Sequence, residues 1–310
     1  MRETAHSDTS DCTETPACAA VERLIQPRDK DLGGFSVRRC LPAVGHRSVG
    51  PWVFFDHFGP AVLAVGPGVD VRPHPHVNLA TVSYLFEGEI LHRDSLGSLQ
   101  AIHPGDLNLM VAGRGIVHSE RERPQAMRHE RRLHGLQLWL ALPQADEETE
   151  PAFHHYPHDD IPALAIGGVP VRVMIGSAFG ATSPVKTFAH TLYVEAELQP
   201  GQTLAVPHAP ERAVYVAQGG VRAGSTAIPE HAMAVLRGSG NDNDSAGIVL
   251  EALEPTRIAI IGGEHLGDRF MEWNFVSSRK ERIEQAKHDW REGRFPKVPG
   301  DEEEYIPLPP

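Results

Sequence analysis

Cysteine, long apolar runs and positive charge are all scarce in this sequence. The 310 residues include three cysteines, and two of them, Cys12 and Cys18, lie in a polar, threonine-rich beginning. An odd number of cysteines placed in this way excludes a framework of disulfide bonds, so we expect a reducing compartment, the cytoplasm. No run reaches the roughly 18 apolar residues of a membrane-spanning helix, so a membrane is not an expected partner.

Basic residues are outnumbered, which argues against a nucleic-acid partner. Lys and Arg together number 29, against 41 Asp and Glu, and the formal net charge is -12. The most basic stretch, 121–132, is interrupted by Glu122 and Glu130. A chain with this balance repels a phosphate backbone, so we expect no direct contact with nucleic acid.

Helical periodicity is also scarce, whereas short strand-like runs are frequent. Between residues 37 and 142, runs such as WVFF, LATVSYLFEG and GLQLWLAL alternate with glycine- and proline-rich turns, and the pattern resumes later with VPVRVMIG and TLYVEAEL. Strands at this spacing are typical of sandwiches and barrels. A weak internal repeat, HPHVNLATVSYLFEGEI against PHAPERAVYVAQGGV, indicates two barrels related by duplication.

These patterns predict an all-β protein with two jelly-roll-like barrels. The intervening residues are acidic and contain proline without periodicity, which favours a linker. We expect a disordered leader over 1–20, an N-terminal barrel over 21–142, the linker over 143–165, a C-terminal barrel over 166–275, and a helix and tail over 276–310.

One helix is expected near the end of the chain. Ser278 and Glu281 have the spacing of a capping box, in which a serine begins the helix and a glutamate bonds back to it. Apolar residues then recur at helical intervals, at Ile283, Ala286 and Trp290. We expect an amphipathic helix over about 279–292 that packs this apolar face on a barrel wall.

Histidine is abundant, with 18 in the chain, and spacing singles out a few of them as candidate ligands. In His74-Pro75-His76 the two imidazoles lie two positions apart, so on an extended strand they project from the same face. His118 and Glu120 repeat this spacing on a later strand-like run. If the two strands face each other across a barrel, three imidazoles and one carboxylate converge.

This mixed set of nitrogen and oxygen donors suits a transition metal. It fits Fe, Mn, Ni, Cu or Zn and is too rich in nitrogen for Ca or Mg. An ion that accepts five or six ligands would keep open positions, which marks a site that binds a further ligand, above all an anionic oxygen. A single histidine in a strand is more often a structural residue, but two such pairs beside glycine- or proline-rich turns favour the metal.

Other polar residues of this region are assigned to turns. Residues 87–89 (EGE) have the composition of a hairpin turn, and His92 and Asp94 belong to a segment, HRDSLG, that we expect to be solvated. The second barrel offers only His208 as a comparable histidine, without a partner pair, so we expect it to hold no metal.

The segment that carries the candidate ligands resembles the signature of the pirin family, within the cupin superfamily. It reads HPHVNLATVSYLFEGEILHRDSLGSLQAIHPGDLNLMVAGRGIVHSERE. The earlier VRRCLPAVGHRSVGPWVFFDHF is similar to the segment that precedes the signature in pirins, and WNFVSSRKERIEQAKHDWREGRFPKVPGDEEEYIPLP to the ending of a bacterial branch. The resemblance therefore runs from residue 37 to the end of the chain.

The resemblance implies a bicupin, two β-barrels stacked face to face, with iron in the N-terminal barrel. The ligand motifs HPH and H-x-E of the family fall on His74, His76, His118 and Glu120. The resemblance also implies quercetin 2,3-dioxygenase activity, hence a flavonol and O2 as substrates, with Glu120 as the candidate general base. It leaves a second function open, a non-enzymatic metal- or redox-responsive regulator that binds a partner protein.

Two features depart from these family patterns. Many cupins place a glutamate ligand three or four residues after the paired histidines, where this sequence has Ala80 and Thr81, so Glu120 must supply the carboxylate. Many pirins have a glycine at the position of Asn78, so we expect the backbone after the HPH to differ locally.

Overall fold

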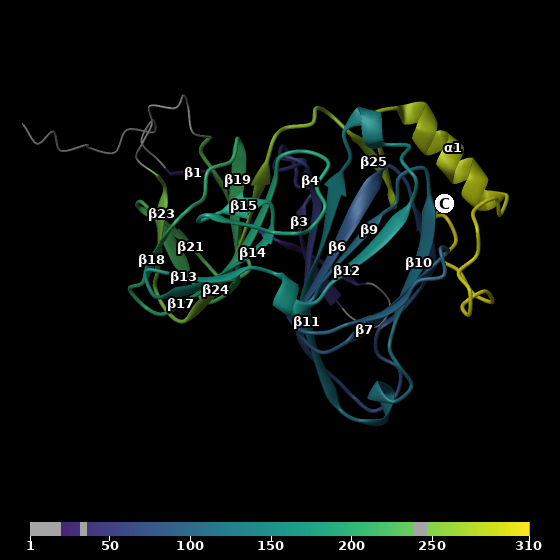
Figure 1. Cartoon of the computed structure of the whole chain (residues 1–310), viewed down its shortest axis with the longest axis horizontal. Helices are drawn as coiled ribbons and strands as arrows, with labels where there is room; N and C mark the ends of the chain where they lie inside the picture. Colours follow the sequence, from purple (N-terminus) through teal and green to yellow (C-terminus); the bar gives the residue numbers. More distant parts are fainter. Residues whose placement is uncertain (1–19, 32–35, 239–246, 310) are drawn as a thin grey trace, which may run out of the picture.

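The protein is built almost entirely of strands. The computed structural model describes residues 20–31, 36–238 and 247–309, and within these ranges it has one α-helix, α1 (Lys280–Arg291). The strands form two domains that lie side by side (Figure 1). The all-β prediction with a C-terminal helix is confirmed. The expected leader over 1–20, with Cys12 and Cys18, lies outside the described residues except for its last position.

The first domain is a sandwich of two antiparallel sheets. The larger has the order β12-β9-β6-β11-β4-β3-β2, and the smaller has the order β5-β10-β7-β8. The larger sheet is made of β2 (Arg28–Asp31), β3 (Ser36–Leu41), β4 (Trp52–Leu63), β6 (Leu79–Glu87), β9 (Leu107–Val111), β11 (Arg131–Ala141) and β12 (Ala152–Tyr156). The smaller sheet is made of β5 (Asp70–His76), β7 (Ile90–Asp94), β8 (Leu99–Ile102) and β10 (Ile116–Arg121).

The central strands of the larger sheet, β6, β9 and β11, are buried on both faces over most of their length, which explains their nearly continuous apolar runs. Along β6, Ala80, Val82 and Tyr84 belong to the core shared with the second domain. Thr81 and Ser83 alternate with them and are buried on the opposite face, inside the sandwich. A polar residue within these apolar strands therefore marks the inside of the first domain.

The second domain repeats the arrangement, with sheets ordered β1-β22-β19-β24-β17-β14-β13 and β18-β23-β20-β21. Its larger sheet is made of β1 (Val21–Ile25), β13 (Ala163–Ile166), β14 (Val169–Ile175), β17 (Thr191–Leu198), β19 (Glu211–Gln218), β22 (Met233–Leu236) and β24 (Thr256–Gly263). The others are β15 (Ser177–Ala178), β16 (Ala181–Thr182), β18 (Thr203–Ala205), β20 (Val221–Ala223), β21 (Thr226–Ile228) and β23 (Val249–Ala252). Aliphatic side chains such as Val171, Leu204 and Ile260 fill its interior.

Two segments lie elsewhere than the sequence indicates. Residues 21–25, assigned to the N-terminal barrel, form β1, which pairs with β22 of the second domain, Ile25 opposite Met233. The expected linker over 143–165 contains β12, which extends the larger sheet of the first domain by pairing with β9. Both differences arise from pairing between distant strands, which a local pattern does not encode.

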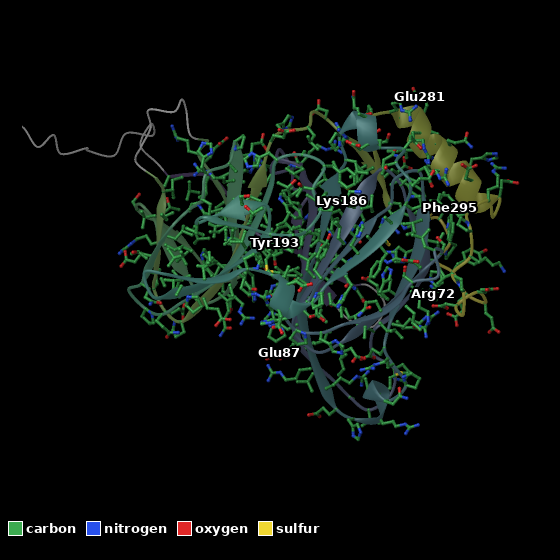
Figure 2. All side chains as sticks on the ribbon, in the orientation of Figure 1. Arg72, Glu87, Lys186, Tyr193, Glu281 and Phe295 are labelled. Atoms are coloured by element: carbon green, nitrogen blue, oxygen red, sulfur yellow. The ribbon has the colours of Figure 1, made fainter. Side chains whose placement is uncertain are left out.

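The two larger sheets pack face to face through one apolar cluster. The cluster joins Trp52 and Phe55 of the first domain to Tyr193 and Tyr215 of the second, and Tyr193 lies where the domains meet (Figure 2). The indole Nε1 of Trp52 donates hydrogen bonds to the carbonyls of Leu192, at 3.2 Å, and Gly262, at 3.0 Å. The domains are therefore joined by apolar burial and by hydrogen bonds inside it.

After the second domain the chain returns to the first. β25 (Phe270–Glu272) and β26 (Phe275–Ser277) form a small ladder, and Phe275 bridges to Val77 beside β5. In Figure 1 the yellow helix α1 lies against the first domain, on the side away from the second. Ile283 of the helix is buried in a cluster with Val77 and Phe275. The predicted apolar face of the helix is thus confirmed.

The predicted capping box of this helix is wrong. The N-cap is Arg279, which makes no side-chain cap hydrogen bond. Ser278 donates from its hydroxyl to the buried carboxylate of Glu147 instead, at 2.9 Å. A tertiary partner has therefore replaced the local one.

No helix in the described part of the chain is long and apolar enough to cross a membrane.

The indole contact between the domains yields a prediction about stability. Trp52→Phe should lower the free energy of unfolding by about 1–4 kcal/mol, because two buried carbonyls lose their donor and a small cavity remains. Chemical denaturation followed by circular dichroism measures the change. Leu99→Ala, at a side chain that is 63% exposed, is the control and should change stability by less than about 0.5 kcal/mol. Equal stability of Trp52→Phe and wild type would contradict the assigned role.

Candidate metal centre

The structure brings the three predicted histidine ligands together inside the first domain. β5 and β10 are antiparallel neighbours, and His118 lies directly opposite His74. Ligand nitrogens of His74, His76 and His118 all lie within 4.8 Å of one another, and all three side chains are buried. Prolines alternate with the histidines of β5, which is tolerated because β5 is the edge strand of its sheet.

Hydrogen bonds fix the orientation of two of these rings. His74 Nδ1 donates to the carbonyl of Arg72 at 2.9 Å, and His76 Nδ1 to the carbonyl of Asn274 at 3.0 Å. A carbonyl accepts only from a protonated nitrogen, so each ring keeps its Nε2 lone pair for another partner. This is the usual arrangement of metal-binding histidines, in which one nitrogen is held and the other binds the ion.

The third ring has no partner for either nitrogen. Both Nδ1 and Nε2 of His118 are buried and make no hydrogen bond with the described residues. A buried polar group left in this way costs about 1–3 kcal/mol. A transition-metal ion fits this site, because it would engage a lone pair of His118 together with the free lone pairs of His74 and His76.

The charge state of the rings also suits a metal. Burial lowers the pKa of His74 to about 4. Burial likewise lowers the pKa values of His76 and His118 well below the ordinary value, and the neighbouring imidazoles add to the effect. At neutral pH all three rings are therefore uncharged, which is the form that coordinates metals.

Glu120 lies next to this group but not within it. Its side chain is buried, and its Oε1 accepts hydrogen bonds from Ser83 Oγ at 3.4 Å and Gln137 Nε2 at 3.3 Å. Burial raises the pKa of the Glu120 carboxyl group. Among the described residues the set of ligand atoms within 4.8 Å consists of the three imidazoles. Coordination by Glu120 therefore stays a prediction.

A cavity of about 760 Å³ adjoins the histidines, and His74, His76 and Glu120 form part of its wall. A volume of this size accommodates a small organic ligand. The apolar part of the wall consists of Val37, Phe54, Phe58, Val69, Val71, Ile90, Trp139, Trp273 and Ile306. Polar wall residues include Arg39, Asp56, Asp70, Arg72, Gln137, Asn274 and Glu304.

An aromatic stack forms part of the cavity wall. Phe54 and Trp139 are parallel, with ring centroids 3.9 Å apart and planes at 9°. Trp139 meets the ring of His76 edge-on at 5.0 Å. On its other side Phe54 carries the guanidinium of Arg39, 4.3 Å from the ring centre and paired with Asp56 at 2.8 Å. Both faces of Phe54 are therefore covered, and the wall offers a planar aromatic ligand edge-to-face rather than stacked contacts at this ring.

The sequence reading missed a histidine–aspartate pair beside the site. On β7, His92 lies opposite Glu120 and Asp94 lies opposite His118. Both side chains are buried, and His92 Nε2 bonds the carboxylate of Asp94 at 3.0 Å. The ring of His92 stacks on Phe153 with centroids 4.3 Å apart. The expectation of a solvated HRDSLG turn is therefore wrong for these two residues.

The turn begins at Ser95, three residues later than expected. The second carboxylate oxygen of Asp94 accepts the backbone N–H groups of Leu96 and Ser98, so Asp94 ends the strand and shapes the turn at once. The alternation of Ile90, His92 and Asp94 was the available signal, because these residues share one face of a strand. Residues 87–89 do form a turn, but it leads from the larger sheet to the smaller one and does not close a hairpin.

The departures from the family patterns have a structural explanation. Asn78 has φ of 58°, in the left-handed region that glycine adopts freely and asparagine tolerates better than most residues. Its side-chain amide donates to the carbonyl of Glu147 at 2.5 Å, a bond that a glycine would lack. Ala80 belongs to the core between the domains, so that position does not face the histidines.

The second domain shows no comparable site in its described part. His208 lies in the loop before β19, away from the aliphatic interior. Within the described ranges no second group of three His, Cys, Asp or Glu ligand atoms lies as close together as the first. That the second domain holds no metal stays a prediction.

Two family models match the chain. One, described as Pirin, covers residues 34–140, and the other, described as the Pirin C-terminal cupin domain, covers residues 193–296. The first match contains the three histidines and Glu120. The second contains most of the second domain together with β25, β26 and α1.

Similar proteins match along almost the whole chain. A "Pirin-like protein" of Caulobacter vibrioides is 47% identical, covering 93% of this chain and 99% of the relative. A Pseudomonas aeruginosa protein named "Putative quercetin 2,3-dioxygenase" is 36% identical, covering 98% of this chain and 94% of the relative. The crystal structure of quercetin 2,3-dioxygenase from Acinetobacter baumannii superposes with a TM-score of 0.85 at 31% identity, covering 93% of this chain and 95% of that one. With both family models matched and relatives aligned from end to end, the chain belongs to the pirin family and has its two cupin domains.

Proposed function

We propose that this chain is an iron-dependent dioxygenase of the quercetin 2,3-dioxygenase type, which acts on a flavonol and O2 in the cytoplasm. His74, His76, His118 and Glu120 are the proposed metal ligands. The names of two similar proteins, from Pseudomonas aeruginosa and Acinetobacter baumannii, support this activity. The donor set itself accepts Mn, Ni, Cu or Zn in place of iron, so the choice of iron rests on the family.

The observation that carries the proposal is the cluster of three neutral imidazoles, two of which, His74 and His76, lie in the wall of a cavity lined with aromatic residues. A flavonol is flat and aromatic, and it has a hydroxyl group next to a ketone. Its rings can pack against the aromatic residues of the wall, among them Phe54 and Trp139, while its oxygen pair can reach the part of the wall formed by His74 and His76. Shape and donor chemistry therefore point to the same class of ligand.

The chemistry divides between the ion and the chain. When bound, the ion supplies Lewis acidity toward the neighbouring oxygens of the flavonol and redox chemistry toward O2. Trp139 and Phe54 orient the rings, and the apolar wall excludes water from them. The carboxylate of Glu120, when free of the ion, accepts the proton of the 3-hydroxyl group. Gln137 and Ser83 hold that carboxylate in place through their hydrogen bonds.

Substitution at Glu120 should separate catalysis from metal binding. Glu120→Gln keeps a neutral oxygen of similar reach, and three imidazoles remain, so iron affinity should fall by no more than about 10- to 100-fold. Flavonol turnover should fall further, by about 100- to 10,000-fold, because glutamine accepts no proton. The measurement is iron per chain at limiting iron, beside flavonol-dependent O2 consumption at saturating iron.

The matched variant is His76→Ala, which should lose iron and turnover together, because one side of the site is left with His74 alone. Wild-type turnover in iron-loaded Glu120→Gln would remove Glu120 as the base. An absence of turnover in iron-loaded wild type would reject the dioxygenase and favour the regulatory function, in which the same ligands bind the metal without catalysis.

The number of metal ions should be one per chain. The second domain has an aliphatic interior, and within the described ranges His208 belongs to no group of three close His, Cys, Asp or Glu ligand atoms. Metal analysis of protein purified without a polyhistidine tag should give one equivalent for wild type and for His208→Ala, and none for His118→Ala. Two equivalents in wild type that fall to one in His208→Ala would show a second site.

A further inference from the structure

The segment that follows the second domain forms part of the metal-site cavity. Trp273, Asn274, Glu304 and Ile306 all belong to it and lie in the cavity wall. Its backbone is hydrogen-bonded to β5, the strand that carries His74 and His76, since the N–H of Ile306 donates to the carbonyl of Pro73 at 2.8 Å. The site is therefore built from two parts of the chain that are about 200 residues apart in sequence.

The closest link between this segment and the ligands is the carbonyl of Asn274. It accepts the Nδ1–H of His76 at 3.0 Å, whereas His74 has an equivalent partner within its own strand. Asn274 follows Trp273, whose φ of 52° is unfavourable for an aromatic residue. Such a conformation persists only where the surroundings impose it, so the position of this carbonyl depends on what holds the segment.

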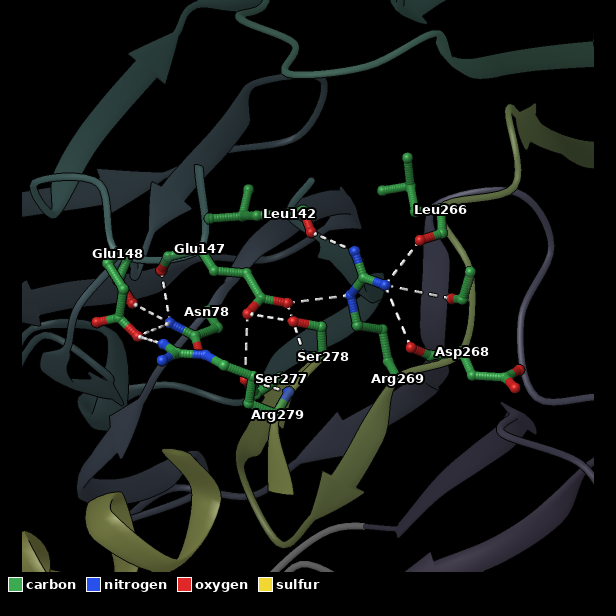
Figure 3. Close-up of polar contacts among 12 residues, drawn as sticks. Asn78, Leu142, Glu147, Glu148, Leu266, Asp268, Arg269, Ser277, Ser278 and Arg279 are labelled. Carbon is green, nitrogen blue, oxygen red and sulfur yellow. Dashed lines mark hydrogen bonds and ion pairs between the residues drawn. The ribbon is translucent and has the colours of Figure 1, made fainter. Parts of the chain in front are cut away.

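The buried carboxylate of Glu147 holds it (Figure 3). Its oxygens accept from the hydroxyl of Ser277 at 3.1 Å and from the N–H and the hydroxyl of Ser278 at 2.7 and 2.9 Å. Arg269, on the other side, lies 3.2 Å from the same carboxylate. These contacts fix the chain on both sides of residues 273–274.

Glu147 also contacts the chain just after β5, through its backbone. Its backbone carbonyl accepts the side-chain amide of Asn78, two residues after His76. Between the two attachments, Phe275 forms a parallel bridge with Val77. A single residue thus connects the chain just after His76 to the segment that supplies the hydrogen-bond acceptor of His76.

We infer that Glu147 is a positioning residue for the metal centre. It holds residues 277–278 so that the Asn274 carbonyl selects the His76 tautomer with its proton on Nδ1 and its lone pair on Nε2. The inference rests on metal binding by His76, within the proposed function, and not on dioxygenase activity. Loss of such a supporting interaction lowers metal affinity by about 10- to 100-fold in other sites.

The test compares two buried glutamates that each face an arginine. Glu147→Ala removes the attachment of the segment. Glu195→Ala is the control, because Glu195 is also buried and pairs with Arg257, but lies between the domains and accepts from Tyr84. Zn2+ affinity is measured by competition with a chelator, and thermal unfolding is recorded for each variant. Imidazole 15N shifts of the metal-free protein report the tautomers of His74 and His76.

Glu147→Ala should bind Zn2+ about 10- to 100-fold more weakly and give a mixture of His76 tautomers, while His74 stays unchanged. Glu195→Ala should lose thermal stability to a similar degree and keep wild-type Zn2+ affinity. Glu147→Gln, which retains one carbonyl oxygen for the serines, should recover part of the affinity. If Glu147→Ala fails to fold, Ser278→Ala removes one of the same hydrogen bonds and should shift the His76 tautomers in the same direction.

Wild-type Zn2+ affinity and unchanged His76 signals in Glu147→Ala would overturn the inference. Equal loss of affinity in Glu195→Ala would also overturn it, because general stability would then explain the effect. The tautomer signals are read without metal and without a flavonol, so a wild type that shows no turnover leaves this test intact.

Discussion

His118 lies opposite His74 because β10 and β5 pair in one register, and the whole site depends on that pairing. A slip by one residue would turn the side chains of one strand to the other face of the sheet and disperse the ligands. On its other edge β10 pairs with β7, which places His92 opposite Glu120. A single small sheet therefore supplies the three imidazoles, the neighbouring carboxylate and the buried histidine–aspartate pair.

The two domains share an architecture but differ in what fills them. In the second, aliphatic side chains fill the interior of the part that the structure describes. In the first, apolar clusters around Trp139 and around Leu133 leave a polar zone with a cavity. Each end of the described chain is also built into the domain formed mainly by the other half, β1 into the second and α1 into the first. The first domain therefore holds its site with help from residues that follow the second.

Features with a short repeat in the sequence could be predicted. A spacing of two residues on a strand identifies two candidate pairs, His74 with His76 and His118 with Glu120. Helical periodicity predicts both ends of α1 to within one residue. Strand composition was sufficient for the all-β class. In each case the information lies within a few neighbouring residues, where strand and helix periods act.

Features that depend on distant partners could not be predicted. The sequence of β1 is compatible with a first strand of either domain, and its pairing with β22 decides that it belongs to the second. The role of Glu147 in an acidic segment depends on two serines about 130 residues later. The capping-box pattern failed for the same reason, since Ser278 has a stronger partner in that buried carboxylate. Local patterns give candidates, and tertiary contacts choose among them.

Anomalous diffraction at the iron absorption edge, on crystals of iron-loaded protein, would locate the bound metal. We expect one anomalous peak per chain, in the first domain, about 2.0–2.3 Å from the Nε2 atoms of His74 and His76 and from one ring nitrogen of His118. A peak elsewhere, or iron-soaked crystals without a peak between these three rings, would contradict it.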